Sequence, residues 1–474
     1  PYPANSVWDR LPVPVQETII RKKLKVYVID AYKIATEIGL GRRINTIMQT
    51  CFFHLCGLIP PENAIGKIKE YLKKSYGSRG DVIVEMNYKA VDQALPNLFQ
   101  LTIPDKVTGS IQMRPAVPPD APDFVKNNIA PILTGAGDSL PVSAFTPDGT
   151  FASGTTQYLK RTIALEIPQW DPSVCIQCGR CSVLCPHAVI RAKVYEKADL
   201  TGAPPSFQSI VAKHPSLKGL QYTVAISPED CTGCKVCVEV CPAKNRAEPK
   251  FKALNMVPIE SVLEEEKSSW EFFKKLPDYN ASAKTVRELQ FVTPLFEFSG
   301  ACAGCGETPY LTLLSRLYGD RAIIANATGC SSIYGGNEPA TPWTVNKEGK
   351  GPAWSNSLFE DNAEFGLGFR LSIDKQIEQC IELMKKLEPH LGSDLIDALI
   401  KADQMSPEDR FEYRSRVKAL RERLVQIDSP DAKSLLALSD ALIPKSVWLV
   451  GGDGWGYDIG YGGLDHVLSL GKKV

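Results

Sequence analysis

The feature that most constrains this chain is a cysteine pattern that occurs twice. The sequence has 474 residues and 14 cysteines, and many of these cysteines fall between Cys175 and Cys241. Each half of this region reads C-x2-C-x2-C-x3-C-P, first from Cys175 to Pro186 and again from Cys231 to Pro242. In a large chain without a visible signal peptide, such spacing is typical of metal binding rather than disulfides. Because a [4Fe–4S] cluster takes four thiolates, the repeat predicts two such clusters.

The two halves of the repeat are expected to exchange ligands. Three cysteines reach a cluster from one tight loop, but the local geometry directs the fourth away, and in two-cluster ferredoxins it binds the other cluster. One predicted ligand set is therefore Cys175, Cys178, Cys181 and Cys241. The other is Cys231, Cys234, Cys237 and Cys185. Zinc is the alternative for a lone C-x2-C pair, but zinc sites use four ligands and do not need an eight-cysteine repeat of this spacing.

The repeat as a whole resembles a bacterial-type ferredoxin, with one departure. A longer insertion, roughly residues 192–226, separates the two halves and contains several prolines and lysines. We interpret the insertion as a surface loop. The alternative is that it covers a cluster or a partner surface.

Further along the chain, three more cysteines stand among glycines and other small residues. They are Cys302 and Cys305, followed closely by Glu307, and then Cys330. Small residues let the backbone approach a bulky cofactor, so these loops indicate a third cluster, although only three ligands are close in sequence. Cys380 is the candidate fourth ligand, but it lies within an expected helix and is interpreted as a small apolar side chain of the core.

A glycine turn that carries an acid follows an expected strand at residues 446–450. It reads Gly451-Gly452-Asp453-Gly454-Trp455. A carboxylate binds hard cations, and backbone donors at a helix start suit phosphate oxygens, so this turn is a candidate diphosphate–Mg²⁺ site. The motif alone is weak, because many tight turns contain it, and it gains weight from the neighbouring cysteines.

Together these stretches resemble the pyruvate:ferredoxin (flavodoxin) oxidoreductases of the 2-oxoacid:acceptor oxidoreductase family. The matching sequences, all behind the ferredoxin-like repeat, are CAGCGETPY from residue 302, ATGCSSIYGGN from 327, WSNSLFEDNAEFGLG from 354 and GDGWGYDIGYGGLDH from 452. The resemblance implies a [4Fe–4S] cluster next to thiamine diphosphate, bound by Cys302, Cys305 and Cys330. It implies that Glu307 hydrogen-bonds the aminopyrimidine ring of thiamine and helps to activate it. It further implies that Asp453 binds the Mg²⁺ at the diphosphate, in a loop lined by Gly452, Gly454 and Trp455.

The activity that the resemblance implies is oxidative decarboxylation of pyruvate with coenzyme A to acetyl-CoA and CO₂. Electrons would pass through three [4Fe–4S] clusters to ferredoxin or flavodoxin, and the enzyme would be a homodimer. The alternative is a multi-cluster electron-transfer subunit without a catalytic role, in which GDGW is a structural turn. The feature that separates the two is the combination of cysteines and acids at Cys302, Cys305, Glu307 and Asp453, because a pure electron carrier does not need it. A zinc-ribbon interaction module is a third interpretation, and it would be colourless.

We expect an α/β multidomain fold. Residues 1–103 are interpreted as the end of a γ-type α/β domain, part of a doubly wound layer, with a strand at 24–30 and helices at 34–55, 65–76 and 91–101. The helix at 34–55 is expected to be interrupted at Gly39–Gly41. Residues 104–154 are rich in proline and glycine and are interpreted as an extended interdomain linker that wraps over a neighbour. The alternative is a solvated linker without any chemistry.

The two remaining domains carry the sites. Residues 155–275 are expected to form the ferredoxin-like domain, and residues 276–474 the first part of a thiamine-diphosphate-binding α/β domain. Strands are expected at 322–326 and 446–450, with a helical region at 371–442 in which Ser406 caps a helix. The family's fourth proximal-cluster cysteine and second Mg²⁺-binding segment are expected beyond Val474, and further domains before Pro1. We therefore interpret the chain as an internal portion of a larger enzyme, whose remaining parts are its partners.

Composition excludes several other classes. The chain has 54 basic and 54 acidic residues, so its formal net charge is zero, which argues against a nucleic-acid binder. No apolar stretch approaches the ~18–20 residues of a membrane span. With its cysteines in a metal-binding pattern, the protein is expected in the cytoplasm.

Overall fold

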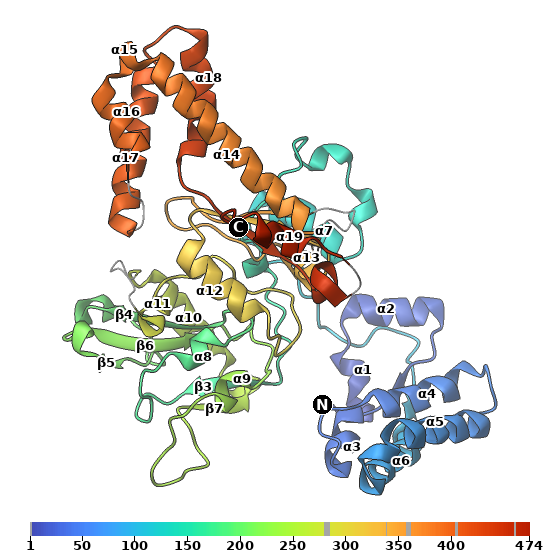
Figure 1. Ribbon diagram of the computed structural model, residues 1–474. Helices are drawn as coiled ribbons and strands as arrows, with labels where there is room; N and C mark the ends of the chain where they lie inside the picture. Colours follow the sequence, from blue (N-terminus) through green and yellow to red (C-terminus); the bar gives the residue numbers. More distant parts are fainter. Residues whose placement is uncertain (1, 279–284, 338, 357–361, 403–405, 459–460) are drawn as a thin grey trace. The chain divides into compact units, whose positions relative to one another are not determined.

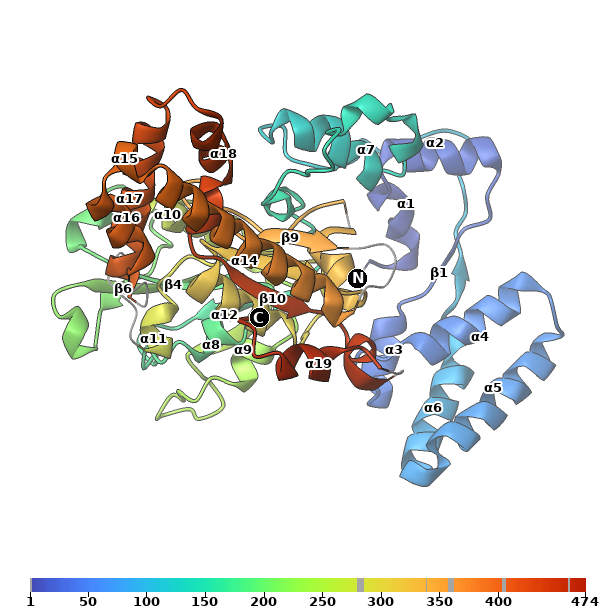
Figure 2. The same cartoon turned by 45° about the horizontal axis from the view of Figure 1, so that its top comes forward.

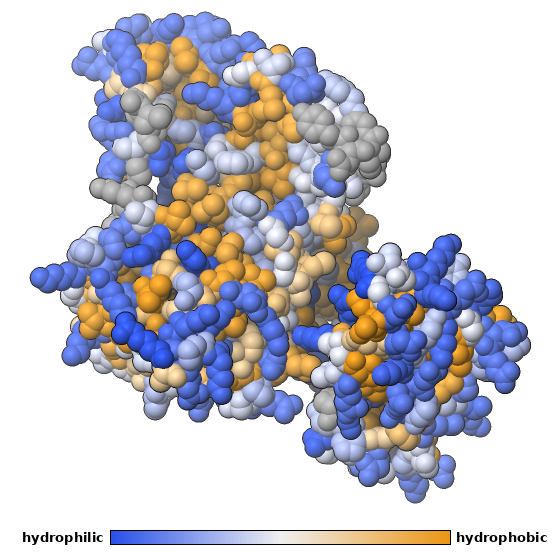
Figure 3. Space-filling view, turned by 60° about the horizontal axis from the view of Figure 1, so that its bottom comes forward, coloured by the Kyte–Doolittle hydropathy of each residue, from blue (hydrophilic) through white to orange (hydrophobic). Residues whose placement is uncertain are grey.

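The computed structural model divides the chain into two compact units, Pro1–Pro115 and Ala116–Val474 (Figure 1). The structure describes residues 2–278, 285–337, 339–356, 362–402, 406–458 and 461–474. Across these ranges, every helix is too short or too polar to span a bilayer. On the face drawn in Figure 3, apolar side chains gather in the middle of the second unit, whereas hydrophilic side chains cover most of its outer edge.

The first unit is mainly helical. Its helices are α1 (Val7–Arg10), α2 (Val13–Lys22), α3 (Ala31–Ile38), α4 (Asn45–Cys56), α5 (Pro61–Tyr76) and α6 (Asp81–Ala94). Strand β1 (Tyr27–Val28) pairs antiparallel with β2 (Phe99–Gln100). The interruption expected at Gly39–Gly41 is confirmed, because α3 ends at Gly39, whose φ of 93° suits glycine. Ile34, Ile47 and Cys51 are buried in one core.

Two expectations for this unit are wrong. The helix expected at 91–101 lies earlier, at α6, because it starts after Gly80 and the chain turns extended at Leu98, just beyond Pro96. The strand expected at 24–30 is only two residues long, and its partner runs antiparallel. No parallel strand pair occurs in the described part of this unit, so a doubly wound layer is not seen there.

The proline-rich segment is only partly a linker. Residues Val125–Ile129 form a π-helical turn that continues into α7 (Ala130–Leu133). Val117, Val125 and Ile129 are buried in a small core of their own, so the solvated interpretation is wrong for this stretch. The segment ends by binding a neighbouring loop: Gly154 N donates to Trp343 O at 2.6 Å.

The ferredoxin-like part of the second unit contains two antiparallel sheets. One pairs β3 (Glu166–Trp170) with β7 (Leu254–Pro258). The other has the order β4-β6-β5, with β4 at Ile190–Tyr195, β6 at Gln221–Ile226 and β5 at Ile210–Val211. Its helices are α8 (Arg180–Val183), α9 (Val236–Glu239) and α10 (Leu263–Lys275), and α11 (Val286–Leu289) follows. The insertion at 192–226 therefore forms most of a sheet with a buried central strand, and the surface-loop interpretation is wrong.

A parallel sheet follows, in the strand order β10-β8-β9 (Figure 2). Its strands are β8 (Ala322–Asn326), β9 (Ala353–Asn356) and β10 (Ser446–Val450), so both expected strands are confirmed. Helix α14 (Ala363–Lys386) packs on the face where Gly366 meets Leu449, since a Cβ at Gly366 would lie 2.5 Å from Leu449 Cγ. The adjacent Trp448 points to the opposite face, where it packs with the core that includes α12 (Thr308–Tyr318).

Helix α14 extends from this sheet into a helical arm (Figure 1). The arm contains α15 (Glu388–Leu391), α16 (Ser393–Ile400), α17 (Pro407–Leu424) and α18 (Pro430–Leu438), which confirms the helical region expected at 371–442. Cys380 is fully buried in the core of this arm, as expected of a core side chain. The expected cap is also confirmed: Ser406 Oγ accepts from Asp409 N at 3.0 Å, and Asp409 Oδ2 accepts from Ser406 N at 3.1 Å.

Ser406→Ala should loosen the start of α17. Loss of an N-cap hydroxyl costs about 1 kcal/mol of helix stability. This raises the equilibrium constant for opening of the first helical turn roughly fivefold. Amide hydrogen exchange of α17 measures this effect locally. Ser415→Ala on the exposed face of the same helix is the control, and equal exchange rates in the two variants would contradict the capping role.

Candidate functional site

The two cysteine loops have the same backbone path. In the first loop, Gln177 and Gly179 have positive φ values of 57° and 76°; in the second, the equivalent Gly233 and Lys235 have 66° and 69°. Each loop also donates a backbone N–H to the first sulfur of its repeat, from Gln177 to Cys175 and from Gly233 to Cys231, both at 3.4 Å. The repeat in the sequence is thus a repeat in space, with N–H groups directed at the sulfurs.

The first predicted ligand set lies together. Burial raises the pKa of the Cys181 thiol well above its ordinary value, and three neighbouring thiols raise it further. Those neighbours are Cys175, Cys178 and Cys241. The last comes from the other half of the repeat, so the structure brings together the four cysteines that the spacing assigns to one cluster.

The second predicted set lines one small pocket. The four cysteines around it are Cys185, Cys231, Cys234 and Cys237. Burial raises the pKa of the Cys231 thiol to about 12, with Cys185 and Cys234 contributing. The structure therefore brings the second predicted ligand set together as well. Among the described residues, no group of three or more His, Cys, Asp or Glu side chains has a geometry that could hold a metal ion.

The insertion between the two halves covers the first cysteine loop. Gln177 Nε2 donates to Val211 O at 2.9 Å, and Gln177 Oε1 accepts from Lys213 N at 2.7 Å. Lys213 Nζ reaches Cys175 O at 2.7 Å. These contacts support the alternative interpretation made from the sequence, in which the insertion covers a cluster or a partner surface.

The third candidate site forms where two parallel strands end. Gly329 and Cys330 follow β8, and Gly452 and Asp453 follow β10. The two turns touch, because a Cβ at Gly329 would lie 2.7 Å from Gly452 N. The carboxyl edge of a parallel sheet is where α/β proteins bind ligands. Residues 357–361, which belong to the quoted stretch after β9, lie outside the described residues.

Asp453 presents an open carboxylate at this edge. Its side chain is exposed, and Oδ1 accepts one hydrogen bond, from Gly454 N at 3.0 Å. The Trp455 ring lies against the turn, since a Cβ at Gly451 would come within 2.3 Å of its Cδ1 atom. Glycine at 451 thus makes room for the indole, and the carboxylate oxygens remain accessible to a hard cation.

Glu307 and Tyr334 face each other beside the cysteines. Burial raises the pKa of Glu307, and the Tyr334 hydroxyl partly offsets that rise. Burial raises the pKa of Tyr334 still more strongly, with further contributions from Glu307, Cys305 and Cys330. Among the described residues, the Tyr334 hydroxyl makes no hydrogen bond of normal geometry. Glu307 precedes α12 but accepts no capping hydrogen bond, so its carboxylate is directed elsewhere.

Tyr334 is the site residue that the sequence reasoning missed. It lies in the quoted ATGCSSIYGGN stretch, four residues after Cys330. This short distance from a predicted cluster ligand was the only signal in the sequence. A tyrosine that is 4% exposed usually finds a partner for its hydroxyl, which marks this one as unusual.

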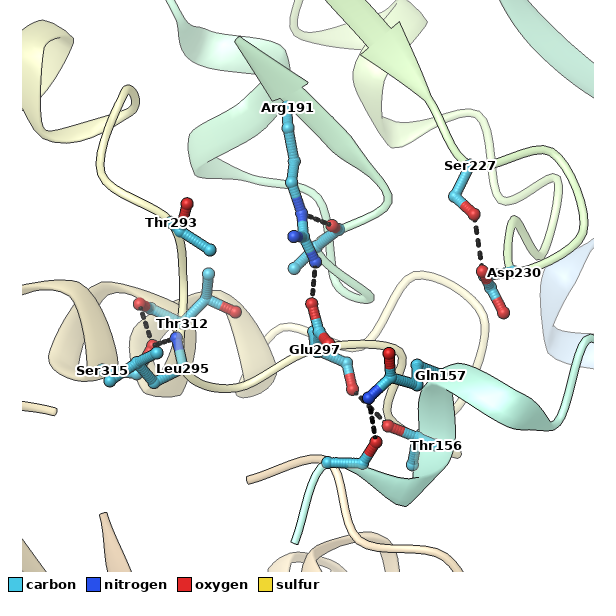
Figure 4. A network of polar contacts seen from close by, with 12 residues as sticks. Thr156, Gln157, Arg191, Ser227, Asp230, Thr293, Leu295, Glu297, Thr312 and Ser315 are labelled. Atoms are coloured by element: carbon cyan, nitrogen blue, oxygen red, sulfur yellow. Dashed lines mark hydrogen bonds and ion pairs between the residues drawn. The ribbon is translucent and has the colours of Figure 1, made fainter. Parts of the chain in front are cut away.

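The third site is joined to the second cysteine set. A Cβ at Gly304 would lie 3.9 Å from Cys234 Cβ, so the Cys302–Cys305 loop packs on the second cysteine loop. The segment before it is fixed by polar contacts (Figure 4): Arg191 pairs with Glu297, and Thr156 Oγ1 donates to Glu297 O at 2.8 Å. His187, two residues after Cys185, contacts Ser299 O through Nδ1 at 3.0 Å.

Comparisons with known proteins agree with this arrangement. A family model described as "4Fe-4S dicluster domain" matches residues 174–245, which contain both ligand sets. The model "Pyruvate ferredoxin/flavodoxin oxidoreductase" matches residues 3–96, and a domain of unknown function matches residues 110–164. The fold and the cysteine sites thus define an iron–sulfur protein of the α/β multidomain class.

Relatives along the whole chain identify the family. The chain is 52% identical to a putative pyruvate-flavodoxin oxidoreductase of Synechocystis over 100% of its length. It is 50% identical to a probable pyruvate-flavodoxin oxidoreductase of Escherichia coli, again over 100%, and 48% identical to a pyruvate:ferredoxin oxidoreductase of Moorella thermoacetica over 99%. The chain belongs to the pyruvate ferredoxin/flavodoxin oxidoreductase family. It spans about 40% of the length of these relatives.

Cys241→Ala should damage the cluster assigned to Cys175, Cys178 and Cys181. Because a missing thiolate leaves one iron without its ligand, the variant should show the same spectroscopic loss as Cys178→Ala. Electron paramagnetic resonance and iron content of the reduced protein measure it. Cys380→Ala is the control and should keep all its iron. A loss that matched Cys234→Ala instead would overturn the exchange of ligands.

Proposed function

We propose that this chain is part of an enzyme that converts pyruvate and coenzyme A to acetyl-CoA and CO₂. The reaction releases two electrons, which leave singly through three [4Fe–4S] clusters to ferredoxin or flavodoxin. The observation that carries the proposal is the third site, where the turns with Cys330 and Asp453 touch at Gly329 and Gly452. The names of the relatives support the choice of pyruvate and of the acceptor.

The residues present fit thiamine diphosphate with Mg²⁺. The open Asp453 carboxylate would be a hard oxygen ligand for the cation, and it stands among glycines that allow a close approach of phosphate oxygens. Glu307 would bond the aminopyrimidine and hold or move a proton at its carboxylate, beside the buried Tyr334. When bound, thiamine supplies the electron sink that makes loss of CO₂ from a 2-oxoacid feasible.

The same contacts suggest the order of electron transfer. The Cys302–Cys305 loop packs on the loop of Cys234, so the second cysteine set lies next to the third site. The Cys237 thiol also lies within electrostatic reach of Cys181, which belongs to the first set. Electrons would therefore pass from the third site to the second set, then to the first set, and then to the acceptor.

The third cluster needs a ligand that this sequence does not provide nearby. Cys380 is unsuited, because its Sγ is buried in the helical arm and donates to Leu438 O at 3.5 Å. We propose that the fourth thiolate comes from another part of the enzyme. Large apolar side chains close in sequence to the site are exposed, at Tyr310, Ile333 and Tyr461, and further protein would cover them.

Asp453→Ala should weaken Mg²⁺-dependent binding of thiamine diphosphate and leave the two ferredoxin-like clusters intact. The diphosphate is neutralised by the cation, and the variant removes one of its oxygen ligands. Titration of thiamine diphosphate at fixed Mg²⁺, alongside iron content, measures the effect. Asp394→Ala, an exposed acid on α16, is the matched control. Equal affinity in the two variants would argue against a diphosphate site at this turn.

Glu307→Gln tests the function itself. The wild-type enzyme should reduce a one-electron acceptor when pyruvate and coenzyme A are present, which a non-catalytic electron-transfer subunit would not do. The variant should lose most of this turnover, by roughly 10²–10⁴-fold, since a glutamine cannot move a proton.

The melting temperature and iron content separate this role from a structural one. Both should stay unchanged in Glu307→Gln, because Glu307 caps no helix. Near-normal turnover with a lower melting temperature would instead assign Glu307 to stability. No pyruvate-dependent reduction by the wild type would favour the electron-transfer subunit.

A further inference from the structure

One pocket of the second unit has five basic side chains among its lining residues. It lies between β4, α10 and the segments 290–294 and 345–347, and its basic side chains are Arg191, Lys193, Lys274, Arg316 and Lys347. Most of them are neutralised by carboxylates. Arg191 pairs with Glu297, Lys274 pairs with Glu271, and Lys193 and Lys347 share Asp278. The pocket is therefore not a general anion site, and Arg316 is the exception that needs an explanation.

Arg316 is a buried cation whose hydrogen-bond partners are neutral. It is 8% exposed; one Nη donates to Gln290 Oε1, the other donates to Ser182 Oγ at 3.3 Å, and Nε has no partner among the described residues. No described carboxylate pairs with it. A buried charge is strongly unfavourable unless an opposite charge compensates it. The compensating charge must therefore come from something other than an acidic side chain of these residues.

The contacts of Arg316 lead to the cluster ligands. Ser182 follows Cys181 in α8, and Gln290 packs against Gly179, where a Cβ would lie 3.1 Å from Gln290 Cγ. Burial and then the nearby Arg191 lower the pKa of Arg316, and the Cys185 sulfur partly offsets this. The segment from Cys178 to Cys185 supplies ligands to both predicted sets. Arg316 thus lies beside the short segment that joins the two clusters.

We propose that Arg316 is the buried counter-charge of the ferredoxin-like clusters, and that it raises the midpoint potential of the cluster that includes Cys181, the neighbour of its hydrogen-bond partner Ser182. This inference rests on the two clusters of the proposed function. A [4Fe–4S] cluster with four thiolates is an anion, and each reduction adds one electron and one negative charge. A fixed cation in a low-dielectric interior stabilises the reduced form more than the oxidised form. Because Arg316 would act through the cluster, it is a positioning residue and not a catalytic one.

Three variants of the anaerobically purified enzyme test this role. Arg316→Met and Arg316→Gln remove the charge, whereas Arg316→Lys keeps it. Redox titration followed by electron paramagnetic resonance measures the potentials of the ferredoxin-like pair. In the two neutral variants at least one reduction equilibrium should fall about tenfold, which is about 59 mV for one electron. The lysine variant should recover most of this shift. Arg370→Met, which removes a buried arginine that pairs with Asp374 in α14, should leave the potentials unchanged.

The other outcomes are equally informative. Unchanged potentials in iron-replete Arg316→Met and Arg316→Gln would overturn the proposal, and so would an equal shift in Arg316→Lys. Loss of iron in the neutral variants but not in Arg316→Lys would support a need for the charge, whereas loss in all three would assign Arg316 to hydrogen-bond geometry. A wild-type protein without [4Fe–4S] signals would refute the clusters of the proposed function instead.

Discussion

The cost of burying thiolates is the constraint on which the second unit depends. Burial alone raises the pKa of the thiols at Cys181, Cys185 and Cys237, and neighbouring cysteines raise it further. Metal ligands bind as thiolates, so iron must supply the free energy that deprotonates these groups and holds them together. The strands, the two loops and the covering insertion thus form a frame in which the buried sulfurs become thiolates only when iron binds them.

Structural features that depend on neighbouring residues were predicted best from the sequence. The strands at 322–326 and 446–450, the capping box at Ser406 and the break at Gly39 were all recognisable, because short apolar runs, cap residues and glycine act within a few positions. The cysteine sets were equally accessible, since their spacing records a loop geometry. By contrast, the prediction of a helix at 91–101 was wrong, because it relied on apolar periodicity that continues past Pro96. The observed helix begins after Gly80.

Structural features that depend on long-range packing could not be predicted from the sequence. The insertion at 192–226 looked like a polar loop, but β6 is buried on both faces and so lacks the alternation that marks a half-exposed strand. Tyr334 and Glu307 are distant in sequence, and only the meeting of α12 with the turn after β8 places them together. Arg316 is another such case, because a helix arginine is ordinarily a surface residue and its neutral neighbours come from α8 and from Gln290.

The two cysteine loops share a backbone but have become specialised. Gln177 accepts a left-handed conformation that glycine adopts more easily, and its amide holds the insertion over the first loop. At the equivalent Gly233, a Cβ would lie 2.9 Å from Glu166 O, so any side chain there would collide with β3. The two loops are therefore not interchangeable. Exchange of one for the other would place a side chain against β3 at one site and remove the amide that binds the insertion at the other.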